Sequence, residues 1–149
     1  MIERLDYIEI NPKAINGLGA LNKHVATIDA HLRALVELRL SQLNGCVYCV
    51  DLHAQQARSH GETQQRIDCL SAWSECPFFD EMEKAAFSWA EAVTFLGDTS
   101  APGHLFKDLS LHFSEEQIVD LTLIISLMNA WNRIAVSFRH LPEKRLKEG

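Results

Sequence analysis

The sequence lacks a long uninterrupted apolar segment. No stretch reaches the roughly 18 consecutive apolar residues that a membrane-spanning helix needs. The first ten residues, MIERLDYIEI, carry acids early and lack the basic start and apolar middle of a signal peptide. We therefore expect no membrane partner and a cytoplasmic location.

An excess of basic residues is also missing. The chain has 14 Lys and Arg against 20 Asp and Glu, which gives a net charge of -6 at pH 7. Proteins that bind phosphate backbones usually carry a basic patch, so we expect no nucleic-acid partner. The chain has no flavin- or nicotinamide-binding signature either, and we expect no cofactor.

Patterns typical of β-strands, internal repeats and low-complexity segments are absent as well. With 149 residues, 47% of them hydrophobic, the chain is long enough for one domain (1–149) with a hydrophobic core. Its apolar residues recur at helical spacing, which predicts an all-α fold, a compact bundle of about six or seven helices. The expected helices run from Pro12 to about Val25, from Asp29 to Asn44, from Cys46 to Gly61, from Thr63 to Leu70, from Asp80 to Leu96, from His104 to Leu111, and from Ser114 to a stop at Pro142.

Local signals support these boundaries. Asn11 precedes a proline at the first helical position, as N-caps often do. The patterns D-x-x-E at 80–83 and S-x-x-Q at 114–117 resemble capping boxes. The segments SAWSECPFF and GDTSAPG read as loops, because proline and small polar residues interrupt the helical pattern.

Two cysteines and one histidine lie close together in the segment SQLNGCVYCVDLHAQQAR (41–58). On a helix that begins near Cys46, with Cys46 as the origin, Cys49 lies at about 300° and His53 at about 340°. All three then share one narrow arc. The N–H groups of a first helical turn stabilise a thiolate, and a neutral histidine one turn later can accept the thiol proton. A second thiol within reach can close an oxidised sulfur into a disulfide.

Three interpretations of this cluster remain open from the residues alone. The cysteines can be small buried hydrophobes beside a core histidine. They can bind zinc, which needs four ligands or three plus water, but Cys69 and Cys76 do not form a second closely spaced pair. They can be a redox pair, which is the interpretation that we favour for a close cysteine pair in the cytoplasm.

The segment ALVELRLSQLNGCVYCVDLHAQQAR (34–58) resembles the core motif of the carboxymuconolactone decarboxylase superfamily, in its alkylhydroperoxidase D (AhpD)-like branch. Two further segments, 71–94 and 112–139, resemble the later helices of that family, so that the resemblance covers about 11–139. It implies an all-helical AhpD-like fold, a homo-oligomer (trimer or hexamer) and an antioxidant thiol peroxidase activity.

The resemblance also implies a role for each residue of the motif. Cys49 would attack a small hydroperoxide, Cys46 would resolve the resulting sulfenic acid, and His53 would belong to a proton relay. An external dithiol of the lipoyl or thioredoxin type would then reduce the disulfide.

Two positions depart from the family pattern. The family's relay glutamate lies twelve residues before the first cysteine, where this chain has Ala34. Glu37 is one helical turn closer to the motif, and it is either a replacement in the same pocket or a solvated surface acid. Tyr48 takes the place of a histidine between the cysteines and is either a hydrogen-bond donor or, as we expect, a packed aromatic.

Two other functions fit parts of the pattern. A lactone decarboxylase of the same superfamily would use acid–base chemistry and would not need both Cys46 and Cys49. A non-enzymatic helical oligomer that senses redox state would form the disulfide without efficient turnover.

Overall fold

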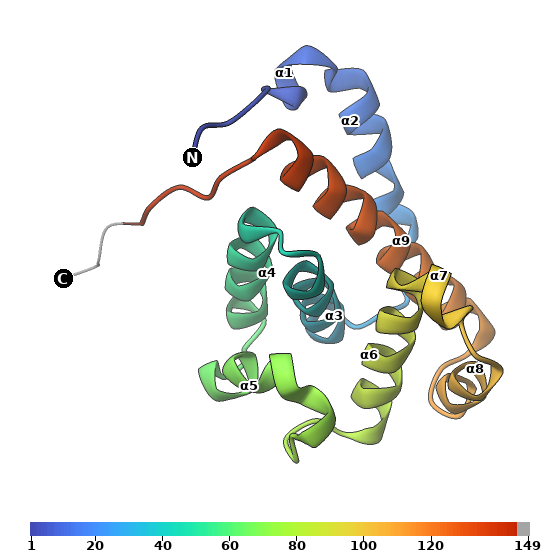
Figure 1. The fold of residues 1–149 in the computed structure, drawn as a ribbon. Helices are drawn as coiled ribbons and strands as arrows, with labels where there is room; N and C mark the ends of the chain where they lie inside the picture. The colour runs from blue at the N-terminus through green and yellow to red at the C-terminus, as the bar shows by residue number, and fades with distance from the viewer. Residues whose placement is uncertain (146–149) are drawn as a thin grey trace.

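The computed structural model describes residues 1–145, and these residues form a helical bundle without a strand (Figure 1). The all-α prediction is therefore confirmed. In chain order the elements are α1 (Tyr7–Ile10), α2 (Pro12–Gly19), the 3-10 segment η1 (Ala20–His24), α3 (Ala30–Asn44), α4 (Val47–Ser59), α5 (Gln64–Cys69), the 3-10 segment η2 (Leu70–Glu75), α6 (Glu81–Thr94), α7 (Leu96–Thr99), α8 (Gly103–Ser110) and α9 (Glu115–Phe138).

The described residues contain nine α-helices, more than the six or seven that the sequence predicts. The two extra helices, α1 and α7, have four residues each, which is too short to show a helical period in the sequence. Helix α7 and the segment η2 lie partly in the two stretches that were predicted to be loops, so those two predictions are wrong in part.

The predicted helix starts are largely confirmed. The side chain of Asn11 caps α2, that of Asp29 caps α3, and both capping boxes, at Asp80 and at Ser114, are formed. The first long helix is shorter than predicted, because α2 gives way to 3-10 geometry at Ala20.

The last helix also ends earlier than predicted. Helix α9 stops at Phe138, before the expected stop at Pro142, because Arg139 adopts the left-handed conformation (φ 56°) that closes many helices. The chain from His140 to Arg145 is irregular. It passes near α1, where the Tyr7 hydroxyl is 2.7 Å from His140 Nδ1.

The core lies where α3 and α9 meet the other long helices. Helix α3 packs against α4, α6 and α9, and α9 packs against α3, α4, α6 and α8. In length and mean hydropathy (1.3) α9 would be able to cross a membrane, but its apolar residues include much of this core. In contrast, α1, α2 and η1 bury no residue fully and lie along one side of α9 (Figure 1).

Candidate functional site

A tight turn between α3 and α4 presents the two cysteines. Helix α3 ends at Gly45, whose φ of 66° is left-handed and therefore suits a residue without Cβ. The next residue, Cys46, is extended (φ -85°, ψ 97°), and its N–H donates to the carbonyl of Ser41 at 3.0 Å. Cys46 is thus the N-cap of α4 rather than its first helical residue. The helical angles of about 300° for Cys49 and about 340° for His53 took Cys46 as part of the helix, which it is not.

The cap geometry nevertheless joins the two sulfurs. Cys46 and Cys49 form a disulfide with a Cα–Cα distance of 5.2 Å, and both residues are buried (1% and 3% exposed). Cys46 Sγ also accepts the Cys49 N–H at 3.3 Å. Cys49 lies in the first turn of α4, where backbone N–H groups favour negative charge on sulfur.

A cavity of about 550 Å³ opens beside Cys49. This volume is within the range of small-molecule sites. Cys49 and His53 line the cavity, whereas Cys46 does not. The opposite wall is mostly apolar and comes from α1, α2 and α9: Ile8, Ile15, Ile124, Leu127, Met128, Trp131 and Ala135. Of the two sulfurs, Cys49 is therefore the one that a ligand in the cavity meets.

His53 is held in a defined orientation. Its Nδ1 is 2.8 Å from Gln56 Oε1 and 3.8 Å from Glu37 Oε2, and an ionised carboxylate can only accept. Nδ1 therefore carries the proton, and Nε2 is the basic nitrogen. Burial lowers the pKa of His53 below its ordinary value, although the Glu37 carboxylate and the Gln56 hydrogen bond oppose this effect. The ring is therefore neutral at pH 7 and able to accept a proton.

Glu37 lies in the cavity wall rather than on the open surface. Its Oε1 accepts a hydrogen bond from Arg33 Nε at 2.7 Å, and its side chain is 14% exposed. Ala34, at the position of the family's relay glutamate, also lines the cavity but has no group to move a proton. Of these two positions on α3, Glu37 is the one that brings a carboxylate to His53.

Tyr48 packs as an aromatic. Its ring centroid is 3.9 Å from that of His140, and its hydroxyl makes no hydrogen bond to any residue from 1 to 145. His140 in turn is hydrogen-bonded to Tyr7, and all three side chains line the cavity. Sequence reasoning missed Tyr7 and His140, because 133 positions separate them and neither belongs to a motif.

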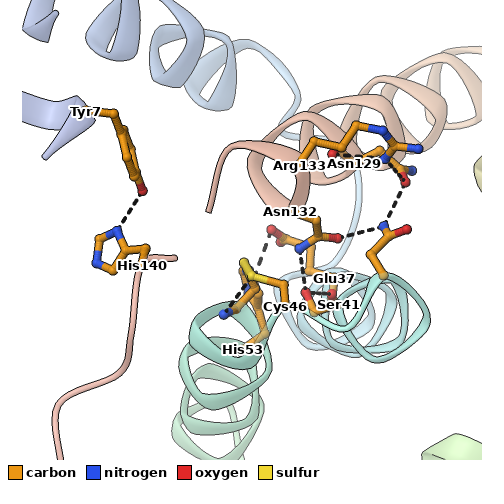
Figure 2. Close-up of a disulfide and its surroundings, with 11 residues drawn as sticks. Tyr7, Glu37, Ser41, Cys46, His53, Asn129, Asn132, Arg133 and His140 are labelled. Carbon is orange, nitrogen blue, oxygen red and sulfur yellow. Dashed lines mark hydrogen bonds and ion pairs between the residues drawn. A yellow bond between two sulfur atoms is a disulfide. The ribbon is translucent and has the colours of Figure 1, made fainter. Parts of the chain in front are cut away.

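A buried polar network lies on the other side of the cysteine turn (Figure 2). It joins Asn132 of α9 to Ser41 and Asn44 at the end of α3. The sequence assigned no role to Asn132, because the position of a residue along one helix does not show which residue of another helix it contacts. Among residues 1–145, no group of three or more His, Cys, Asp or Glu side chains is close enough to hold a metal ion.

These features define an all-helical protein with a buried C-x-x-C disulfide at the wall of a cavity. The sequence profile described as "Carboxymuconolactone decarboxylase family" matches residues 12–92, more than half of the chain. The chain therefore belongs to the carboxymuconolactone decarboxylase family. It is also 41% identical over 139 residues to the uncharacterized protein YdfG of Bacillus subtilis (strain 168), covering 92% of this chain and 95% of YdfG.

Solved structures place the fold in the AhpD-like branch of that family. A protein of unknown function from Agrobacterium tumefaciens, for which a role as an antioxidant defence protein AhpD has been suggested, superposes with a TM-score of 0.92. It is 38% identical, and the match covers 96% of this chain and all of that one. The debrominase Bmp8 shares the fold at a TM-score of 0.76 and 22% identity, over 91% of this chain and 74% of Bmp8.

Proposed function

We propose that the protein is a thiol-dependent hydroperoxide reductase that serves in antioxidant defence. One observation carries the proposal: Cys49 faces the cavity and shares a disulfide with Cys46, which does not. This arrangement suits a reaction in which one sulfur meets the substrate and the other closes the cycle.

The first step is the attack of Cys49 on the hydroperoxide. His53 Nε2 takes the Cys49 thiol proton, and the first turn of α4 stabilises the thiolate that forms. The thiolate bonds to the terminal oxygen of ROOH, and the O–O bond breaks. The proton on His53 passes to the leaving RO⁻, directly or through water, and the products are ROH and a Cys49 sulfenic acid.

The second step forms the disulfide seen in the structure. The Cys46 thiol attacks the Cys49 sulfur, and the hydroxyl leaves as water together with the thiol proton. Gln56 Oε1 at 2.8 Å and the Glu37 carboxylate at 3.8 Å both favour the His53 tautomer with its proton on Nδ1, which leaves Nε2 to exchange a proton. An external dithiol of the lipoyl or thioredoxin type then reduces the disulfide and is itself oxidised.

The proposal extends to the setting of the reaction. The substrate is a small hydroperoxide, and the enzyme works in the cytoplasm as a homo-oligomer, a trimer or a hexamer. Cys69 is a thiol outside the disulfide with which the reactivity of Cys49 can be compared. Burial, and then the neighbouring Cys76, raise the pKa of the Cys69 thiol, so that this thiol should react slowly.

The test is a peptide-mapped thiol assay. The protein is fully reduced and given one equivalent of cumene hydroperoxide, its thiols are alkylated at set times, and the unreacted cysteines are mapped. We expect a rapid Cys46–Cys49 disulfide, while Cys69 and Cys76 remain open to alkylation. If Cys46 and Cys49 stay reduced, or react no faster than a free thiol in solution, the proposal is wrong.

Two further measurements separate the alternatives. A redox-sensing oligomer would form the disulfide but would not turn over when dithiol and hydroperoxide are both supplied in excess. A lactone decarboxylase would act on its substrate even after both Cys46 and Cys49 are replaced by serine.

A further inference from the structure

One buried amide on α9 is tied to the end of α3. Asn132 is fully buried, its Nδ2 donates to Ser41 Oγ at 3.2 Å, and its Oδ1 accepts from Asn44 Nδ2 at 2.9 Å. Figure 2 shows this side chain between the two helices, beside the turn that leads to Cys46. Asn132 is therefore hydrogen-bonded to Ser41 and Asn44, the first and last residues of the final turn of α3.

The same turn fixes the backbone of Cys46. The Ser41 hydroxyl donates to the carbonyl of Glu37 at 2.7 Å, and the Ser41 carbonyl accepts the N–H of Cys46 at 3.0 Å. Ser41 is thus bonded to Asn132 through its side chain and to Cys46 through its backbone. A shift of Ser41 would move the bond that keeps Cys46 in its extended N-cap conformation.

A buried amide is an unusual choice at this place. The neighbouring inward-facing residues of α9, such as Met128 and Ala135, are apolar. A polar group that is removed from water lowers stability unless its hydrogen bonds are satisfied. Among the described residues no buried side-chain nitrogen or oxygen lacks a partner, and both polar atoms of the Asn132 amide are hydrogen-bonded. Such a network specifies one relative position of two helices more narrowly than an apolar contact does.

We propose that Asn132 is a positioning residue for the Cys46–Cys49 pair. By fixing the α3–α4 turn, it holds the Cys46 sulfur where it bonds to Cys49 and raises the effective concentration of one sulfur at the other. The inference rests on the dithiol–disulfide cycle of the proposed function. It adds that α9, which carries no cysteine, sets the equilibrium of that cycle.

The experiment measures this equilibrium without hydroperoxide. Oxidised protein is equilibrated with graded ratios of reduced to oxidised dithiothreitol, quenched by alkylation, and the Cys46–Cys49 disulfide is quantified. We expect Asn132→Leu to lower the equilibrium constant for disulfide formation at least about fivefold. The matched control is Thr122→Val, which removes the 3.0 Å hydrogen bond from Trp89 Nε1 on α6 to the same helix α9, far from the turn.

The comparison of Asn132→Leu with Thr122→Val tests whether Asn132 acts on the disulfide through the α3–α4 turn. A general loss of α9 packing would move both variants equally, and an Asn132→Leu shift no larger than that of Thr122→Val would overturn the inference. If Asn132→Leu does not fold, Ser41→Ala serves instead, since it removes the hydroxyl that Asn132 contacts but keeps the carbonyl that holds Cys46. We expect a shift in the same direction, and no shift would again overturn the inference. A protein without peroxidase activity would still give this result, so a failure here is distinct from a failure of the proposed function.

Discussion

The Glu37 carboxylate lies close to the His53 ring, and this contact allows a prediction about the pKa of His53. In the variant Glu37→Gln, the carboxylate 3.8 Å from His53 Nδ1 becomes a neutral amide of similar shape. Glu37 raises the pKa of His53 against the larger lowering by burial. Its removal should therefore lower the pKa of His53 further, and the ring should stay neutral to a more acidic pH.

The size of the shift follows from the distance. Two unit charges 3.8 Å apart interact with roughly 1 kcal/mol at a dielectric constant of about 80, and with roughly 4 kcal/mol at about 20. Arg33 pairs with the same carboxylate and offsets part of its charge, which favours the low end of this range. We therefore expect the pKa of His53 to fall, with a loss of interaction energy nearer to about 1 than to about 4 kcal/mol.

Histidine-selective NMR of the oxidised protein, titrated between about pH 4 and 8, measures this shift. The His53 signal is assigned from its loss in His53→Gln. The control is Glu91→Gln. Glu91 lies on α6 and pairs with Arg39, which is on α3 like Glu37, but the Glu91 carboxylate does not contact His53. The electrostatic argument is refuted if Glu37→Gln leaves the pKa of His53 unchanged or raises it, or if Glu91→Gln lowers it as much.

Two further predictions concern the cysteine turn. With Cys46→Ser, hydroperoxide should leave a Cys49 sulfenic acid that dimedone traps, whereas Cys49→Ser should yield little adduct on Cys46; mass spectrometry of both variants checks this, and equal adducts would contradict the assigned roles. Gly45→Ala should lower the free energy of unfolding by about 1 to 2 kcal/mol, because φ is 66° there although the space is open. Urea denaturation measures this against Gly17→Ala, which has open space in α2 and a φ that suits alanine, and an equal effect of both changes would count against the strain argument.

Much of the fold could be predicted from short-range chemistry. The caps at Asn11, Asp29, Asp80 and Ser114 were readable because each bond spans three residues or fewer. The short helices α1 and α7 could not be read in the same way, since four residues do not complete a repeat of the apolar pattern. The end of α9 at Phe138 was also missed, because no proline or glycine marks the left-handed residue Arg139.

In the candidate site, too, the local features could be predicted from the sequence and the others could not. That Cys46 and Cys49 lie together and that His53 follows one turn later were visible in the sequence, because one turn of backbone connects them. The extended conformation of Cys46 was not, because it depends on Gly45 and on the Ser41 carbonyl as much as on α4. Cys46 therefore does not have the helical position expected for it, but it does lie next to Cys49 as expected.

The long helices, the cysteine motif and the choice between a few chemistries could be read from the sequence, since these follow from residues within one or two turns of each other. The tertiary structure was needed to show which sulfur faces the cavity and that Glu37, rather than Ala34, brings a carboxylate to His53. It alone joined Asn132 to Asn44 across 88 positions and Tyr7 to His140 across 133. Such contacts depend on how whole helices pack, and packing is a property of all the apolar faces together rather than of any local pattern.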